Sequence, residues 1–188
     1  MFNLTMNRAI LFVDGMHIYH LARNMDIEVD YKRLFKFFSE SVPIVRAHYY
    51  NTMLESDEHN PVKPLTDWLG YNGYMVTIKR AVERTDGDGR RRVVGDYSVN
   101  MAVDMLRAAY LKHADHFIFM GSDNDMLPVF EEVSRQGVGI TMVSSIKIKG
   151  AFVSEVLRRA ADEFIDLTDI ATMINRLGDV KAKPAKAT

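Results

Sequence analysis

Short, continuous apolar runs rich in β-preferring residues recur along the chain, and each predicts a buried strand. They cover residues 8–14, 44–52, 74–82, 115–121, 138–144 and 163–167. The segments between them repeat apolar residues at the period of a helix. Those segments are 16–24, 31–40, 61–69, 97–113, 126–137, 151–160 and 168–177. Strands and helices therefore alternate, which is typical of an α/β fold with a parallel sheet and helices on both faces.

The most regular helical repeat follows Asp96, which we expect to be the N-cap of that helix. Its apolar side would consist of Val99, Ala102, Val103, Leu106, Ala109 and Tyr110. Just before it, residues 83–92 are polar and interrupted by glycine, which predicts a loop or the tip of a hairpin.

Length and composition indicate one domain with its own core, because the chain has 188 residues of which 47% are hydrophobic. We expect the domain to span residues 1–178 and a mobile tail to follow at 179–188. Cysteine is absent, which excludes disulfides, cysteine-based zinc sites and thiol catalysis. Neither a signal peptide nor a membrane-spanning segment is recognisable, so a cytoplasmic protein without membrane contact is expected. The net charge of -1 means that any affinity for nucleic acid must come from local patches.

Acidic residues follow two of the predicted strands. Asp14 ends the first strand, and Asp123 and Asp125 come just after the fourth. Ligands of parallel sheets bind beyond the carboxyl ends of the strands, so these acids would share one crevice if the two strands are neighbours. A carboxylate cluster of this kind needs a cation, and oxygen ligands suit Mg²⁺ or Mn²⁺. Such a metal can activate water and stabilise charge on a phosphate, which favours phosphodiester hydrolysis.

Each acid also has a structural interpretation, and the spacing alone leaves both open. Asp14 would cap the helix 16–24, and Ser122 or Asp123 would cap the helix that begins near Met126. Asp104 would form an ordinary surface pair with Arg107, three residues later on the same helix.

Histidines and basic residues offer further candidates. His17 and His20 are three residues apart, as are His113 and His116, but neither pair forms an HExxH zinc motif. Arg90, Arg91 and Arg92 belong to a solvated loop or contact phosphates of a nucleic acid. Stacking on bases would fall to tyrosines, most of which we expect to be half-buried: Tyr49, Tyr50, Tyr71, Tyr74 and Tyr97. Walker-type, GxGxxG and GxSxG motifs are absent, and the sequence DGMH lacks the second aspartate of DxD phosphatases.

Four segments in this order resemble the NYN domain, in particular its LabA-like bacterial branch, a relative of the PIN-domain nucleases. They are ILFVDGMHIYHL, GDYSVNMAVDML, FIFMGSDNDMLPVFEEVSRQGVGITMV and AADEFIDL, spanning about residues 8 to 167. The matching family patterns are FIDGxNL, K-G-D-x-D-V-x-L-x-x-D, SGDSDFxPL and ADxFxxL. The resemblance implies a PIN-like (Rossmann-like) three-layer α/β/α sandwich, with the first and fourth strands adjacent, and a ribonuclease activity.

The resemblance also assigns roles to individual residues. It implies catalytic roles for Asp14, Asp104, Asp123 and Asp125, with Asp14, Asp123, Asp125 and Asp96 holding Mg²⁺ or Mn²⁺. Contacts with RNA are expected from His17, Ser122, Asn124, Arg90, Arg91 and Arg92. The chain departs from the family pattern at Val94, Ser98, His17 and Met126, and Ser98 replaces a family aspartate.

Two functions follow from these residues. The first is a metal-dependent endoribonuclease, and the second is a non-catalytic LabA-like regulator that binds RNA or a protein through the same face. The replacements at His17 and Ser98 favour the second function. Exposed edge strands in such sandwiches would allow a homodimer.

Overall fold

A seven-stranded sheet forms the centre of the protein, as seen in a computed structural model that describes residues 8–54, 62–85, 87–88, 91–148 and 153–176. The strands are β1 (Ala9–Asp14), β2 (Ile44–Leu54), β3 (Tyr74–Thr85), β4 (Arg91–Val94), β5 (His116–Met120), β6 (Gly139–Ser144) and β7 (Glu163–Asp166). Their order across the sheet is β4-β3-β2-β1-β5-β6-β7. All neighbouring strands are parallel except β4, which runs antiparallel to β3.

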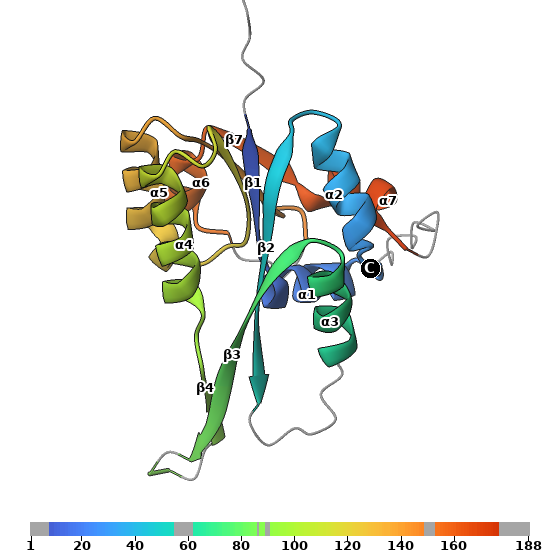
Figure 1. Cartoon of the computed structure of the whole chain (residues 1–188). Helices are drawn as coiled ribbons and strands as arrows, with labels where there is room; N and C mark the ends of the chain where they lie inside the picture. Colours follow the sequence, from blue (N-terminus) through green and yellow to red (C-terminus); the bar gives the residue numbers. More distant parts are fainter. Residues whose placement is uncertain (1–7, 55–61, 86, 89–90, 149–152, 177–188) are drawn as a thin grey trace, which may run out of the picture.

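Helices cover both faces of this sheet (Figure 1). Their bounds are α1 (Gly15–Asn24), α2 (Tyr31–Ser39), α3 (Lys63–Tyr71), α4 (Ser98–Tyr110), α5 (Leu127–Arg135), α6 (Glu155–Ala160) and α7 (Leu167–Ile174), with a short 3₁₀ turn η1 (Asn124–Met126) before α5. In Figure 1 α4, α5 and α6 lie on one side of the sheet, and α1, α2, α3 and α7 lie on the other. The predicted three-layer α/β/α architecture is confirmed.

Strand β1 lies in the middle of the sheet and contributes to both halves of the core. Ile10 and Phe12 pack into the cluster that contains residues of α4 and α5. Leu11 and Val13 belong to the cluster on the opposite face, with residues of α1, α2 and α7. Because side chains alternate between the faces of a strand, a strand covered on both faces is apolar almost throughout, as the sequence 8–14 is.

The segment that joins β3 to α4 is a hairpin, which is one of the two predicted alternatives. Residues at 82–85 and 91–94 pair with each other, so this hairpin includes a strand, β4, that was not predicted. In Figure 1 this hairpin projects beyond the helices. The predicted N-cap, Asp96, is also wrong by one residue, because α4 begins at Ser98 and Tyr97 occupies the N-cap position.

The buried side of α4 agrees only in part with the repeat, since Ala109 is buried and Ala102 and Leu106 are partly buried against the core. Met101, Met105 and Ala108 face the core, whereas Val99 is 72% exposed and Val103 and Tyr110 are exposed as well. Apolar residues lie on more than one side of this helix, so the helical period alone cannot select the side that meets the sheet.

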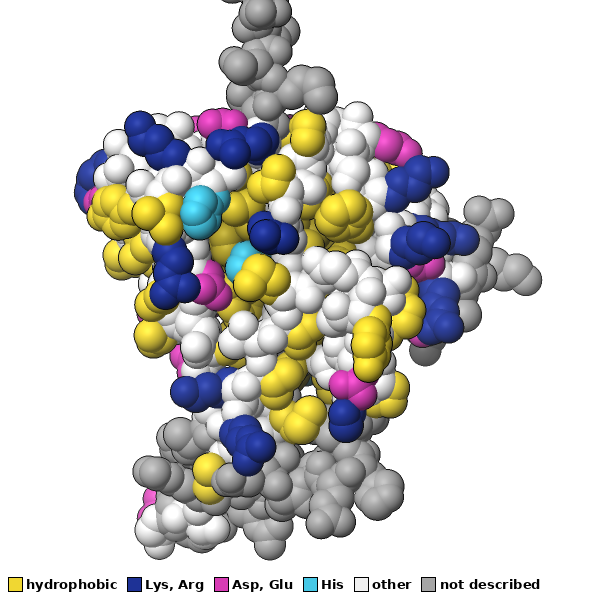
Figure 2. Space-filling view, in the orientation of Figure 1, with side chains coloured by type: hydrophobic (Ala, Val, Ile, Leu, Met, Phe, Trp, Pro, Cys, Tyr) yellow, Lys and Arg dark blue, Asp and Glu magenta, His cyan; other side chains and the backbone are white. Residues whose placement is uncertain are grey.

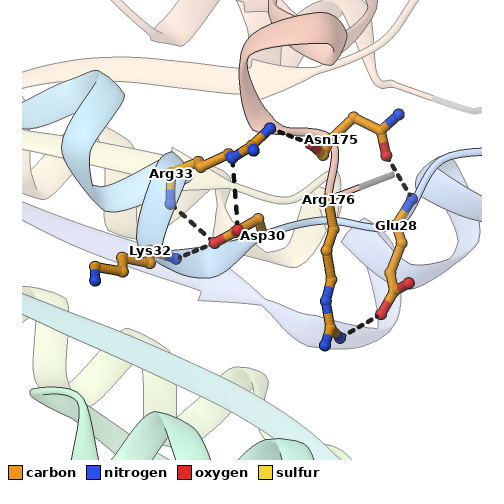
Figure 3. Close-up of polar contacts among 6 residues, drawn as sticks. All are labelled: Glu28, Asp30, Lys32, Arg33, Asn175 and Arg176. Carbon is orange, nitrogen blue, oxygen red and sulfur yellow. Dashed lines mark hydrogen bonds and ion pairs between the residues drawn. The ribbon is translucent and has the colours of Figure 1, made fainter. Parts of the chain in front are cut away.

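A set of polar contacts ties the end of α7 to the segment that joins α1 and α2 (Figure 3). Asp30 caps α2 by accepting hydrogen bonds from the backbone N–H groups of Lys32 and Arg33. The Arg33 guanidinium donates to the backbone oxygen of Asn175 over 2.6 Å, and Arg176 pairs with Glu28 at 2.8 Å. These contacts hold the last helix against the sheet at the far end of the described chain.

The predicted tail, residues 179–188, lies outside the described residues. Within the described chain, every helix is too short or too polar to cross a membrane.

Candidate functional site

The order of strands reverses between β1 and β5. After β1 the chain adds β2 and β3 on one side, and it then returns to add β5, β6 and β7 on the other. The register pairs Val13 with Met120, so Asp14 and Gly121 follow at the same carboxyl edge of the sheet. A crevice at such a reversal is where open α/β sheets bind ligands. The predicted neighbourhood of the first and fourth strands is therefore confirmed.

Gly121 allows the two strand ends to approach closely. A β-carbon at Gly121 would lie 2.6 Å from Cζ of Phe119 and 3.4 Å from the β-carbon of Asp14. A side chain at this position would displace the Phe119 ring, so glycine lets Asp14 and the following Ser122–Asp123 segment share one small space.

Asp14 is half-buried and caps α1. Its Oδ1 accepts hydrogen bonds from the backbone N–H of His17, at 2.8 Å, and from the hydroxyl of Tyr97, at 2.5 Å. Burial raises the pKa of Asp14; these two hydrogen bonds oppose that rise, and the charge of Asp123 adds to it. Ionisation of Asp14 is therefore less favourable in the folded protein than in water, and a cation beside Asp14 and Asp123 would offset this.

Asp123 is held in the same manner on the neighbouring segment. Its Oδ1 caps η1 by accepting from the backbone N–H of Asp125 at 2.9 Å. Its Oδ2 lies 2.6 Å from Oγ of Ser98, and the same Oγ lies 2.7 Å from Oδ1 of Asp96. The predicted caps are therefore confirmed for Asp14 and Asp123, and both residues also lie at the shared strand edge; their metal-binding and catalytic roles stay predictions.

His17 links three strand ends from inside α1. Its Nε2 lies 2.8 Å from Oγ of Ser144, and its Nδ1 lies 3.0 Å from Oγ of Ser122. Burial is the main cause that lowers the pKa of His17 to about 4, so its ring is neutral at pH 7. A neutral ring has one donor and one acceptor nitrogen, which suits two hydroxyl partners. His17 thereby fixes Ser122, the residue before Asp123.

Two of these partners were not recognised in the sequence. Ser144 is fully buried at the end of β6, and Tyr97, which we had considered for stacking, is buried against Asp14. Ser144 had a usable signal, because it ends an apolar run and so lies at the same edge of the sheet as Asp14. The hydrogen bond from Tyr97 to Asp14 depends on where the start of α4 lies relative to β1, and no local sequence pattern indicates this.

Other predicted residues lie apart from this group or on its rim. Asp104 is on α4, where its Oδ2 accepts from the hydroxyl of Tyr50 at 2.9 Å and lies 3.9 Å from Nδ1 of His48. The predicted pair with Arg107 is present at 3.7 Å. Asn124 and Asp125 are exposed on η1. The catalytic role of Asp104 and the metal-binding role of Asp125 stay predictions.

The basic and aromatic candidates are placed differently from each other. Arg91 and Arg92 lie on β4, and Arg90 lies outside the described residues. Four of the five candidate tyrosines are buried, namely Tyr49, Tyr50, Tyr74 and Tyr97. Tyr71 is 91% exposed, but it ends α3 just before β3 begins, at the amino edge of the sheet. None of these five rings is therefore both exposed and close to the acidic pair.

The residues at the strand edge fit a metal ion held by few protein ligands. In the described ranges, no three or more histidine or acidic side chains are grouped so as to hold a metal ion. Mg²⁺ is commonly bound through one or two carboxylates together with waters, and Asp14 and Asp123 supply two. Asp96 does not contact Asp123 directly, because the hydroxyl of Ser98 lies between them, and its metal-binding role stays a prediction.

Comparison with known proteins extends this picture to the whole domain. The sequence model of the NYN domain matches residues 8–169. This chain belongs to the NYN domain family. NYN domains form a PIN-like nuclease family related to nucleic acids.

Two individual proteins are similar to this NYN domain over most of its length. The low amplitude and bright protein LabA of Synechococcus elongatus is 21% identical over 172 residues, which cover 90% of this chain and 89% of that protein. A crystal structure of a protein of unknown function from Vibrio parahaemolyticus has a TM-score of 0.69 at 20% identity, covering 89% of this chain and 96% of the other. The structural likeness supports the fold, and the LabA likeness agrees with the predicted LabA-like branch.

Proposed function

We propose that this protein is a metal-dependent ribonuclease that hydrolyses RNA phosphodiester bonds, with Mg²⁺ or Mn²⁺ held by Asp14 and Asp123. The observation that carries the proposal is the placement of these two carboxylates at the strand-order reversal, where burial, and to a smaller extent the charge of Asp123, raise the pKa of Asp14. Membership of a PIN-like nuclease family supports the same reaction.

The chain's own residues would prepare the site before any ligand arrives. The Tyr97 hydroxyl and the His17 backbone N–H orient Asp14 through its Oδ1, and Ser98 and the Asp125 backbone orient Asp123. A bound Mg²⁺ or Mn²⁺ would polarise a water and neutralise charge that develops on the phosphate. Preorganised ligands of this kind lower the reorganisation needed during the reaction.

Residues around the pair would bind the RNA. Neutral His17 holds the Ser122 hydroxyl beside Asp123, and Asn124 is exposed on the next turn, so both Ser122 and Asn124 are available to phosphate oxygens. Arg91 and Arg92, with Arg90, would contact the backbone with little sequence selectivity. Asp96 would act through Ser98, Asp125 would be a further ligand, and Asp104 would contribute to catalysis from α4.

A second function is favoured by one observation. Ser98 replaces a family aspartate and occupies the space between Asp96 and Asp123, so a third carboxylate is missing from the pair. A non-catalytic LabA-like regulator, which binds RNA or a protein partner through the same face, agrees with this arrangement.

Cleavage of a labelled single-stranded RNA separates the two functions. The ribonuclease proposal expects cleavage with Mn²⁺ or Mg²⁺, none with chelator, and none by Asp123→Asn or Asp14→Asn. Asp67→Asn, which changes an exposed aspartate on α3, controls for contaminating nucleases and should cleave as the unchanged protein does. Equal cleavage by all variants would contradict the proposal. RNA binding that is sensitive to salt, insensitive to chelator and without cleavage would favour the regulator.

A further inference from the structure

The exposed side of α1 begins at the acidic pair. Asp14 caps this helix, and the core-facing residues Gly15, Ile18, Leu21 and Ala22 are buried. Four exposed residues of α1 are spaced three or four apart and therefore lie along one side of the helix. This α1 stripe consists of Met16, Tyr19, His20 and Arg23. This stripe contains an aromatic ring and a cation, and α1 has no acidic residue within its bounds.

Tyr19 is the central member of the stripe. Its side chain is 53% exposed. The edge of His20 lies against its ring, with centroids 5.5 Å apart and planes at 65°, and the guanidinium of Arg23 lies 3.5 Å from its hydroxyl. The ring is thus supported at its edge and at its hydroxyl end by neighbours on the same helix.

The spacing relates this ring to the acidic pair. Tyr19 follows Asp14 by five residues, which is about 7.5 Å along a helix axis. That separation is comparable to the span of one extended nucleotide. Asp14 pairs with Tyr50 of β2, and β2 continues for four more residues, to Leu54. Its neighbour β3 extends into the hairpin with β4. The α1 helix therefore begins at the acidic pair, and its first residue, Gly15, lies against Tyr49 and Tyr50 of β2.

Charge on the neighbouring face fits the same ligand. Figure 2 shows several separate groups of Lys and Arg side chains on the side where β3 lies in Figure 1, with acidic and apolar side chains between them. Lys79 and Arg80 are exposed on β3, before the hairpin that carries Arg91 and Arg92. Although the net charge of the chain is only -1, α1 carries Arg23 and no acid, and β3 carries Lys79 and Arg80, which are cations that a polyanion would meet.

We propose that the α1 stripe is a contact for single-stranded RNA, in which Tyr19 stacks on a base and Arg23 contacts a phosphate. Stacking on exposed aromatic rings beside cations is how proteins bind single strands without reading their sequence. In a duplex the base faces are already stacked, so Tyr19 selects an unpaired segment. This inference rests on the proposed function, because that function is the reason to expect the RNA strand to run toward Asp14 and Asp123. It adds that the RNA substrate is single-stranded.

Binding can be measured without cleavage by using Asp123→Asn as the parent protein. Fluorescence anisotropy of a labelled single-stranded oligoribonucleotide should show Tyr19→Ala binding about tenfold more weakly or worse, whereas Tyr19→Phe keeps the affinity. Arg23→Gln should reduce the slope of log K against log salt by about 0.7, as expected for one lost phosphate contact on a single strand. Tyr71→Ala removes an even more exposed tyrosine at the opposite edge of the sheet and should change nothing. Duplex RNA of the same sequence should be insensitive to Tyr19→Ala.

The outcomes distinguish this proposal from the ribonuclease proposal. Equal affinity of the parent and Tyr19→Ala, or no affinity of the parent for single strands, overturns the α1 contact even if the unchanged protein cleaves RNA. Weaker binding by Tyr19→Ala without any cleavage by the unchanged protein supports the contact and removes the nuclease. A change in sedimentation on Tyr19→Ala with unchanged RNA affinity would show a protein contact instead, and this would also overturn the proposal. Circular dichroism and the Tyr19→Phe variant confirm that folding is intact.

Discussion

Ser98 places its hydroxyl 2.6 Å from Oδ2 of Asp123. The same oxygen lies 2.7 Å from Oδ1 of Asp96, and a hydroxyl has one proton to donate. One of the two short contacts is therefore left without a proton of its own. A cation, or a proton on one carboxyl group, would remove this conflict. Ser98 thus occupies the position of a family acid and also connects the acidic pair to Asp96.

Ser98→Asp should strengthen metal binding, since it restores the acid of the family pattern. Without metal, the extra charge beside Asp123 and Asp96 should lower the melting temperature. With Mn²⁺, affinity measured by calorimetry should rise by about tenfold, in the range seen when the surroundings of metal ligands change. Ser98→Ala, which removes the hydroxyl without adding charge, is the control. Equal Mn²⁺ affinity in all three proteins would contradict a metal site at Asp123.

Asp14→Asn should stabilise the metal-free protein at neutral pH. Burial raises the pKa of Asp14, so its contribution to stability is present at low pH and is lost as the pH rises through the folded-state value. Asparagine keeps an oxygen for the helix cap and has no charge, so the melting temperature at pH 7 should rise by a few degrees, or about 1 kcal/mol. Thermal unfolding at pH 7 and pH 3 checks this, and the gain should vanish at pH 3.

Asp125→Asn is the matched control for that experiment, because the carboxyl group of Asp125 is exposed on η1. The melting temperature of this variant without metal should equal that of the unchanged protein. The rise in melting temperature that Mn²⁺ produces should be lost in Asp14→Asn. A lower melting temperature for Asp14→Asn at pH 7 would show that ionised Asp14 is favourable in the fold.

Stability should fall as the pH drops from 6.5 toward 4 because of His17. The pKa of its ring is lowered to about 4, so the unfolded chain takes up a proton at a higher pH than the folded protein does. Between pH 7 and pH 5 this amounts to about 2 kcal/mol. Urea unfolding at both pH values should show a smaller loss for His17→Asn. His113→Asn, at an exposed histidine between α4 and β5, is the control variant.

Asp104→Asn should leave Mn²⁺ binding unchanged. The contacts of Asp104 are with Tyr50, His48 and Arg107, not with Asp14 or Asp123. If cleavage is lost while the Mn²⁺-dependent rise in melting temperature remains, the predicted catalytic role of Asp104 is separate from metal binding. A smaller effect of Mn²⁺ would place Asp104 among the ligands.

Arg33→Ala should destabilise the fold by about 1 kcal/mol, since it removes one charged hydrogen bond at a half-exposed position. The lost contacts are those to the backbone of Asn175 and to Asp30. Lys32→Ala is the control, because only the backbone of Lys32 takes part in the cluster of Figure 3. Urea midpoints at pH 7 measure both, and equal midpoints would show that the contact adds nothing.

Much of the fold could be predicted because the signals were local and repeated. The apolar runs at 8–14 and 115–121 identified two strands buried on both faces, and the four motifs predicted their adjacency, which the register of Val13 with Met120 confirms. Strand β4 was missed because Arg91 and Arg92 have no apolar pattern, and its pairing with β3 is set by the hairpin.

The positions of the acidic residues of the site could be predicted from the sequence, but their hydrogen-bond partners could not. Asp14 and Asp123 follow strands, so their shared edge follows from topology. The bridge from Ser98 to Asp96 and the bond from Tyr97 to Asp14 depend on where α4 starts, and a one-residue difference changes both. The exposed side of α1 could not be predicted, because the sequence alone does not show whether Tyr19 faces the core or the solvent. The structure decides this by burying Gly15, Ile18 and Leu21.

The polar contacts between the end of α7 and the segment after α1, drawn in Figure 3, have a consequence for synthesis of the protein on the ribosome. Ile170 and Ile174 of α7, the last helix of the described chain, belong to the same buried cluster as Leu11 and Val13 of β1. Until that helix emerges, a nascent chain carries both carboxylates but leaves one face of its central sheet open. A chain terminated before Ile174 would expose this apolar face to aggregation, so α7 has to emerge from the ribosome before this domain can reach its stable form.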